Sequence, residues 1–181
     1  HISYFEAYRR MKKVYTEIRE VEVRTYRFLQ ERPLKIGIVG EVGTMLEQDI
    51  NFDIVKKLQR LGVNVDMSIT ITDYLNETTE KGGKEDIKEA KSLLSQELGG
   101  HGFQSIVNTI FYAKHGYDGV IHILPLSCLP ESTAEPIVDH VADKYQIPLY
   151  RFPIDESNFE AGFNTRLETF VGMLQRKQKV K

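Results

Sequence analysis

Short apolar runs alternate with segments of helical periodicity through residues 34–181. Runs rich in β-branched and aliphatic residues predict four strands, at 34–40, 63–67, 119–124 and 148–152. Apolar residues that recur every three or four positions predict five helices, at 50–61, 87–98, 103–115, 131–145 and 160–178. Strands that alternate with helices are typical of βαβ units and a parallel sheet. The pattern therefore predicts a three-layer, Rossmann-like (flavodoxin-like) α/β fold with a four-stranded, mostly parallel sheet.

A different pattern precedes this domain. Between residues 4 and 31, apolar and aromatic side chains recur at three- and four-residue steps, and Pro33 follows them. The spacing predicts one long helix with a narrow apolar stripe. We therefore divide the chain into an N-terminal helical lead-in, residues 1–31, and an α/β domain, residues 32–181. Within the domain, the polar and glycine-containing residues 76–86 predict a loop.

Composition and charge exclude several classes of protein. The 181 residues are 41% hydrophobic and 28% charged, which is ordinary for a globular domain. A net charge of −2 offers no basic excess to neutralise nucleic-acid phosphates, and no apolar run reaches the roughly 18 residues that span a bilayer. We expect neither a nucleic-acid nor a membrane partner. Because the chain starts without Met and without a signal segment, we expect a fragment of a longer cytoplasmic protein.

Cys128 is the one cysteine of the chain, which excludes an internal disulfide and any metal or cluster site built from this chain's cysteines alone. It lies in the loop after the third predicted strand, and Pro130 is typical of the first turn of the helix that follows. A helix N-terminus favours the thiolate, the form that ligates metals and attacks electrophiles. Three interpretations stay open: a buried structural cysteine, a ligand shared with residues outside this chain, and a nucleophile.

Two other groups of residues could carry chemistry. His101 lies among the glycines of residues 99–102 and could ligate, donate to a carbonyl or cap the next helix. Asp155, Glu156 and Glu160 follow the fourth strand. They could perform acid–base chemistry, or the segment could cap the last helix while Arg166 pairs with one of the acids. The sequence assigns structural roles to three further histidines, His115, His122 and His140.

The turn after the first strand reads Gly40-Glu41-Val42-Gly43-Thr44. It lacks the Lys-Ser/Thr pair of a P-loop and the three glycines of a dinucleotide fingerprint. The carboxylate of Glu41 would also repel a phosphate. The sequence therefore favours a tight strand-to-helix turn here over a nucleotide site.

Several motifs follow one another along residues 34–174: KIGIVGE at 35–41, NFD at 51–53, GGHG at 99–102, PLSCLPE at 125–131 and EAGFNTRLETF at 160–170. In these motifs the chain resembles the 2-hydroxyacyl-CoA dehydratase component family, and within it the domains of CoA-substrate-specific enzyme activase proteins. The resemblance implies a Rossmann-like domain whose parent protein holds a [4Fe-4S] cluster on cysteines from more than one domain. It also implies that an ATP-hydrolysing activator delivers an electron for dehydration or reduction of an acyl-CoA.

Carried over by position, Cys128 matches a cluster ligand of the family, bound to iron. His101, Asp155, Glu156 and Glu160 match motif positions near the site, and no catalytic role is assigned to them. The other cluster cysteines and the activator's phosphate-binding motifs are not in this chain. We therefore expect Cys128 to be one ligand of a cluster completed outside the chain, with no cluster in the chain alone.

The expected partners are the remaining domains of the parent protein, the ATP-dependent activator and an acyl-CoA. The alternative is a non-catalytic docking module of the same fold that binds the activator or a sister subunit. A flavin or nucleotide binder is a weaker third interpretation, since the phosphate-binding loop is missing.

Overall fold

A computed structural model describes residues 3–14, 33–70, 73, 80–155 and 160–180. The chain divides into two compact units, His1–Pro33 and Leu34–Lys181. In the first unit, residues 4–14 are helical, and the predicted continuation over 15–31 lies outside the described residues. Tyr4 and Phe5 of this helix expose 82% and 77% of their surface. The side chains at the start of this predicted helix are therefore exposed to solvent.

The second unit contains four strands: β1 (Lys35–Gly40), β2 (Asn64–Met67), β3 (Gly119–Pro125) and β4 (Leu149–Ile154). They form one sheet in the order β2-β1-β3-β4, and every neighbouring pair is parallel. The predicted α/β fold class and the four-stranded sheet are confirmed, and the sheet is parallel throughout. The strand order reverses direction between β1 and β3, so the switch point of the fold lies between their carboxyl ends.

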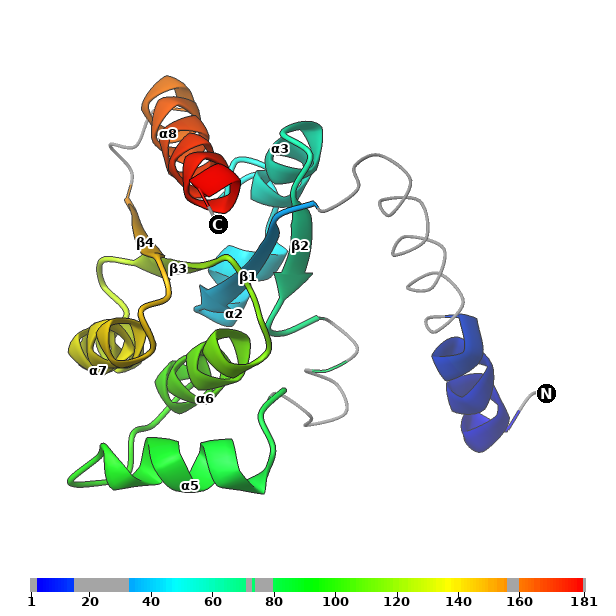
Figure 1. Ribbon diagram of the computed structural model, residues 1–181. Coiled ribbons are helices and arrows are strands. Elements are labelled where there is room, and N and C mark those ends of the chain that lie inside the picture. The colour runs from blue at the N-terminus through cyan, green and yellow to red at the C-terminus, as the bar shows by residue number, and fades with distance from the viewer. Residues whose placement is uncertain (1–2, 15–32, 71–72, 74–79, 156–159, 181) are drawn as a thin grey trace. The chain divides into compact units, whose positions relative to one another are not determined.

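The helices form the outer layers of this unit (Figure 1). They are α2 (Val42–Leu46), α3 (Ile54–Arg60), α5 (Lys84–Ser92), α6 (Gly102–Lys114), α7 (Leu129–Tyr145) and α8 (Glu160–Val180). Helices α3 and α8 cover one face of the sheet, α6 and α7 cover the other, and α5 lies outside α6 and α7. None of the helices among the described residues combines the length and apolar character needed to cross a membrane.

Each face of the sheet has its own apolar core. Ile36, Ile38, Ile121 and Ile123 of the two central strands pack in one cluster with Phe163, Leu167 and Phe170 of α8. Val39 and Val120 point to the opposite face and pack with Tyr112 of α6. Because the central strands are covered on both faces, they read as continuous apolar runs in the sequence.

Three predicted boundaries are wrong. The helix expected over 50–61 starts at Ile54, because Phe52 and Asp53 both adopt the left-handed conformation with φ of 54°. Residues 84–86, expected in a loop, form the first turn of α5, where the Asp86 carboxylate accepts a hydrogen bond from the Gly83 N–H at 3.0 Å. The helix expected over 87–98 ends earlier, at Ser92.

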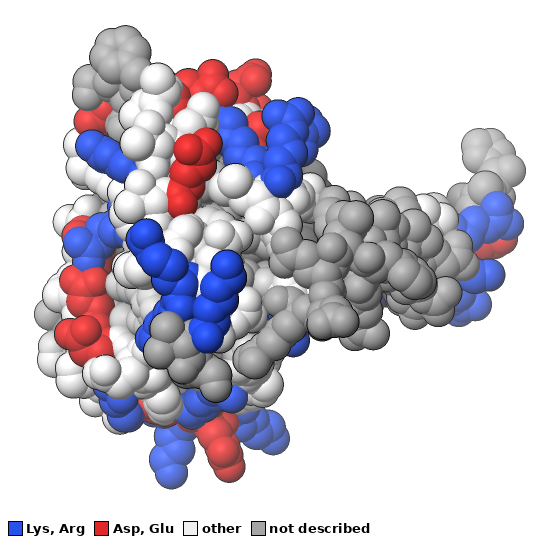
Figure 2. Space-filling model, turned by 45° about the horizontal axis from the view of Figure 1, so that its top comes forward, with Lys and Arg blue, Asp and Glu red and all other residues white. Residues whose placement is uncertain are grey.

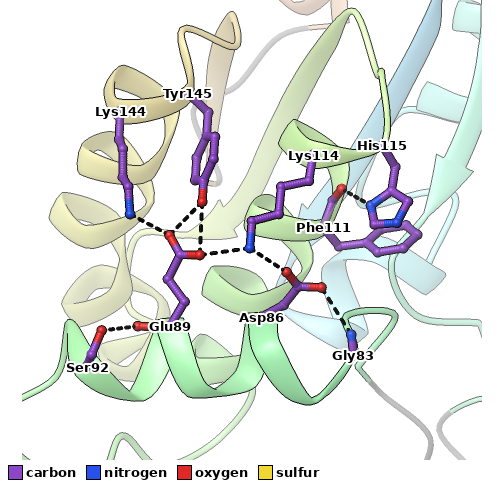
Figure 3. A network of polar contacts seen from close by, with 9 residues as sticks. All are labelled: Gly83, Asp86, Glu89, Ser92, Phe111, Lys114, His115, Lys144 and Tyr145. Carbon is purple, nitrogen blue, oxygen red and sulfur yellow. Dashed lines mark hydrogen bonds and ion pairs between the residues drawn. The ribbon is translucent and has the colours of Figure 1, made fainter.

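A network of charged side chains joins α5 to α6 and α7 (Figure 3). The Glu89 carboxylate on α5 forms ion pairs with Lys114 of α6 at 2.8 Å and with Lys144 of α7 at 2.7 Å. It also accepts a hydrogen bond from the Tyr145 hydroxyl at 2.7 Å. Lys114 also reaches Asp86, at 2.8 Å. Partial burial acts to raise the pKa of Glu89, but hydrogen bonds from Lys114, Lys144 and Tyr145 outweigh it and lower the pKa to about 2.

The Glu89 network gives a prediction on stability. The Glu89→Gln variant should lose about 1–2 kcal/mol of unfolding free energy at neutral pH, because a neutral amide attracts the two lysines less and the pairs are partly exposed. The folded-state pKa lies below the ordinary value of 4.5. The carboxylate therefore contributes fully above that value, and its contribution disappears as the pH falls toward about 2. Urea titrations across this range should show the two proteins converging in acid.

The matched control is Glu168→Gln, which removes the same charge from an exposed position on α8. It should stay close to the parent protein at every pH. A stability difference for Glu89→Gln that persists undiminished into acid would contradict the role assigned to the network.

Candidate functional site

The loops after β1 and β3 meet at the switch point of the sheet. The backbone N–H of Glu41, directly after β1, donates to the carbonyl of Ile123 in β3 at 3.2 Å. Gly40 has a φ of 146°, and a Cβ on it would lie 1.7 Å from the same carbonyl oxygen. Only glycine allows this approach. The close approach places the turn after β1 against the end of β3, and Cys128 lies in the loop that follows β3.

Glu41 caps the short helix α2. Its carboxylate accepts the backbone N–H of Gly43 at 2.8 Å and the N–H of Thr44 at 2.7 Å, as well as the Thr44 hydroxyl at 2.8 Å. Partial burial acts to raise the pKa of Glu41, but these hydrogen bonds and the nearby charge of His101 keep it below its usual value. Since Glu41 occupies the N–H groups that a phosphate would take, the geometry favours the predicted strand-to-helix turn.

The N-termini of α6 and α7 cross closely beside this turn. A Cβ on Gly102 would lie 2.4 Å from the carbonyl oxygen of Pro130, and a Cβ on Gly100 would lie 2.8 Å from the Pro130 ring. Gly100 also has a φ of 61°. His101 stands between these glycines at the N-cap position of α6, but its side chain makes no capping hydrogen bond. His101 therefore occupies the N-cap position that the sequence offered as one of its roles, without a side-chain capping bond.

Cys128 occupies the N-cap position of α7, as the sequence predicts, with a proline in the first turn. Its N–H donates to the carbonyl of Pro125 at 3.0 Å, and its carbonyl accepts the N–H of Ser132 at 2.9 Å. The thiol is half-buried. Leu126 and Leu129, on either side, expose 61% and 76% of their surface. The cysteine thus lies in an ordered turn with an apolar, exposed rim.

A buried polar cluster lies one turn further along α7. The Glu131 side chain, 1% exposed, places one carboxylate oxygen 3.1 Å from the Ser105 hydroxyl of α6. The other oxygen lies 2.7 Å from Nε2 of His122, which is fully buried on β3. Sequence reasoning missed this cluster because it treated His122 as isolated. The available signal was the position of His122 between Val120 and Leu124 on one buried face of the strand.

The structure describes two of the three predicted acidic residues, Asp155 and Glu160. Glu160 opens α8 and pairs with Lys57 of α3 at 2.6 Å, rather than with Arg166. Asp155 follows β4 and is exposed, and Glu156 lies outside the described residues. The residues just before α8 are also outside them, so the predicted cap of that helix stays a prediction.

The NFD motif forms a strained turn at the same edge of the sheet. Asn51 is 2% exposed, and its amide donates to the carbonyls of Thr44 and Met45 at 3.0 and 2.8 Å. This bond set joins the end of α2 to the start of α3, and Phe52 between them takes a left-handed conformation that bulky residues rarely adopt. The Phe52 ring packs 5.1 Å from that of Phe163, beneath the Lys57 ammonium. We assign the motif a structural role.

A groove of about 440 Å³ lies between the end of α5 and the start of α6. Leu94, Leu98 and Phe103 supply its apolar lining, and Lys91, Ser95, Gln96 and Glu97 its polar one. A Cβ on Gly102, where α6 crosses α7, would lie 3.0 Å from the Leu98 side chain. The groove is therefore adjacent to the GGHG turn, although no candidate residue of the sequence lines it.

The donor set of the described residues does not hold an iron–sulfur cluster by itself. A cluster takes about four thiolates or substitute ligands, and the chain has one cysteine. Across the described ranges, no three His, Cys, Asp or Glu side chains gather closely enough to hold a metal ion. Cys128 could therefore supply at most one cysteine ligand to such a cluster.

The comparisons with known proteins give no relative. No family model matches the chain, and neither a curated protein nor a solved structure matches it significantly.

The crossing of α6 and α7 gives a second prediction. Gly102→Ala should destabilise the chain by about 1–3 kcal/mol, because the new methyl group meets backbone atoms of Pro130 that cannot turn away. Gly99→Ala is the matched control, since a Cβ on Gly99 meets nothing within 4 Å. Thermal unfolding of both variants measures the difference. Equal melting temperatures for the two variants would contradict the close crossing.

Proposed function

We propose that this chain is a domain of a 2-hydroxyacyl-CoA dehydratase-like or activase-related iron–sulfur protein. In this proposal Cys128 supplies one cysteine ligand to a [4Fe-4S] cluster shared with a domain outside the chain. The parent protein would carry out an ATP-activated radical dehydration or reduction of an acyl-CoA in the cytoplasm. The observation that carries the proposal is the ordered turn that holds Cys128, half-buried, at the N-cap of α7 beside the switch point.

The position of Cys128 supports a ligand better than a structural cysteine. Structural cysteines are usually buried among apolar side chains, whereas this thiol is half-buried and lies between the exposed Leu126 and Leu129. Since the carboxyl ends of β1 and β3 form the crevice where doubly wound sheets bind ligands, Cys128 also lies in the expected place.

The residues around Cys128 would orient the cysteine and would keep water away from it once a second domain binds. Hydrogen bonds on both sides of Cys128 fix its backbone, and the two exposed leucines offer an apolar rim that a second domain could cover. An iron–sulfur cluster bound there would supply one-electron transfer. His101 lies close enough to Glu41 to contribute electrostatically to the lowered pKa of that carboxyl. That pair would add polar contacts at the edge of the site.

The proposal predicts a loss of iron on removal of the thiol. The complete gene product and its Cys128→Ser variant are produced without oxygen, and iron, acid-labile sulfide and the electron paramagnetic resonance signal after reduction are measured. We expect a cluster signal in the parent protein that is lost or altered in the variant, because a hydroxyl is a poor ligand for iron in a cluster. Ser127→Ala, an exposed neighbour, is the matched control and should keep the signal.

An unchanged cluster in Cys128→Ser, or no iron and sulfide in the parent protein, would reject the ligand role. The second outcome would favour a non-catalytic docking module that binds the activator or a sister subunit. The exposed Leu126 and Leu129 support that alternative, because paired apolar side chains on a rigid turn are typical of protein contacts. Basic and acidic side chains are interspersed over the face that Figure 2 displays, and we propose neither a nucleic-acid nor a membrane partner.

A further inference from the structure

The buried polar cluster of Ser105, His122 and Glu131 lies directly behind the Cys128 turn. Glu131 is the third residue of α7, three positions after Cys128. An acidic side chain at that position ordinarily reaches back to the N–H of the N-cap residue. Here the N–H of Cys128 already donates to Pro125, and the Glu131 carboxylate points into the protein.

The two oxygens of Glu131 are held by two different elements. Ser105 donates from α6 at 3.1 Å, and Nε2 of His122 lies at 2.7 Å on β3. A carboxylate held at both oxygens has a defined position and a defined rotation. Since Glu131 belongs to the first turn of α7, these two contacts tie that turn to α6 and to β3.

Among the described residues, the other contacts of the first turn of α7 are backbone hydrogen bonds and the packing of Pro130. No side chain caps the helix, and the proline in the turn has no N–H to donate. Leu126 and Leu129 are exposed and bury little surface. The Leu126 N–H donates to the carbonyl of Ile154 in β4 at 3.3 Å, and the close packing of Pro130 on Gly100 and Gly102 limits the distance between α6 and α7. This packing does not by itself define the rotation of the turn.

His122 depends on Glu131 in return. Its Nδ1 is buried and has no hydrogen-bond partner among the described residues, and its Nε2 faces the Glu131 carboxylate. Without Glu131, the imidazole would be buried with neither nitrogen paired. The cluster therefore acts as a unit in which the carboxylate is the shared member.

We propose that Glu131 is the positioning residue of Cys128: it anchors the first turn of α7 to α6 and β3, and so holds the cysteine at the switch point. The inference deepens the proposed function and rests on it for its significance. The positioning itself can be measured on the chain without any cluster, so either proposal can fail while the other stands.

The test is amide hydrogen exchange of the 181-residue chain, read at the N–H groups of Cys128 and Ser132, whose hydrogen bonds bracket the turn. Glu131→Ala should accelerate exchange at these two amides about tenfold through local opening, while the core amides of β3 keep their rates. The alkylation rate of the Cys128 thiol should rise in parallel. Glu131→Gln should rescue both readouts, because its amide oxygen accepts from His122 and its amide N–H donates to Ser105.

Two further variants complete the design. Glu135→Ala is the matched control: Glu135 lies one turn further along α7 and pairs with Arg151 at 2.6 Å, so its removal should leave the Cys128 turn unchanged. Ser105→Ala removes one of the two contacts and should accelerate exchange at Cys128 and Ser132 by a smaller factor. The Ser105→Ala variant tests the proposal if the Glu131→Ala chain does not fold.

Three results would overturn the proposal. The first is normal exchange at Cys128 and Ser132 in a folded Glu131→Ala chain, or in Ser105→Ala if only that variant folds. The second is uniform acceleration of all amides, which indicates general loss of stability. The third is a Glu131→Gln variant that behaves like Glu131→Ala, since the hydrogen bonds would then not be the cause.

Discussion

A carboxylate with almost no access to water joins three elements of this domain at the carboxyl edge of its sheet. Glu131 is 1% exposed and contacts Ser105 of α6 and His122 of β3. Losing one member of such a buried polar group is unfavourable, because its partners stay buried and unpaired. The close crossing of α6 and α7, the first turn of α7 and the position of Cys128 all depend on this group having the right geometry.

The domain uses a second kind of electrostatic contact on its outer layer. The network around Glu89 joins α5 to α6 and α7 through side chains that are partly exposed, such as Lys114 at 31% and Lys144 at 46%. Pairs of this kind are weakened by salt and by acid. The outer helix α5 is therefore more sensitive to solution conditions than the first turn of α7, whose polar group is buried.

The sequence predicts the elements of this fold better than their ends. Apolar runs identify the four strands because both faces of the sheet are covered. The start of α3 could not be predicted, since a left-handed Phe52 depends on the buried amide of Asn51 and its contacts with α2. The start of α5 was missed because polar residues 84–86 are as typical of a helix's first turn as of a loop.

The candidate site was predictable only where a local sequence pattern indicates it. A cysteine followed by a proline after a strand indicates a helix N-cap, and Cys128 occupies one. The contact between Ser105 and Glu131 joins positions 26 residues apart. That pairing follows from how α6 crosses α7 and not from any local pattern. The sequence shows Glu131 only as a charged residue near a helix start, where solvent exposure is the ordinary expectation.

The combination of a rigid base and an exposed rim decides what the Cys128 turn is suited to do. Buried hydrogen bonds fix the turn from behind, while Leu126 and Leu129 stay open to solvent. A partner that covers an already ordered turn does not have to order it on binding, and such preorganisation is where much of the free energy of association is gained or lost. A cysteine with only a packing role would need neither the hydrogen bonds of Glu131 nor exposed leucines beside it. The two features together fit a cysteine that is presented to a second surface, whether that surface completes a cluster or only docks.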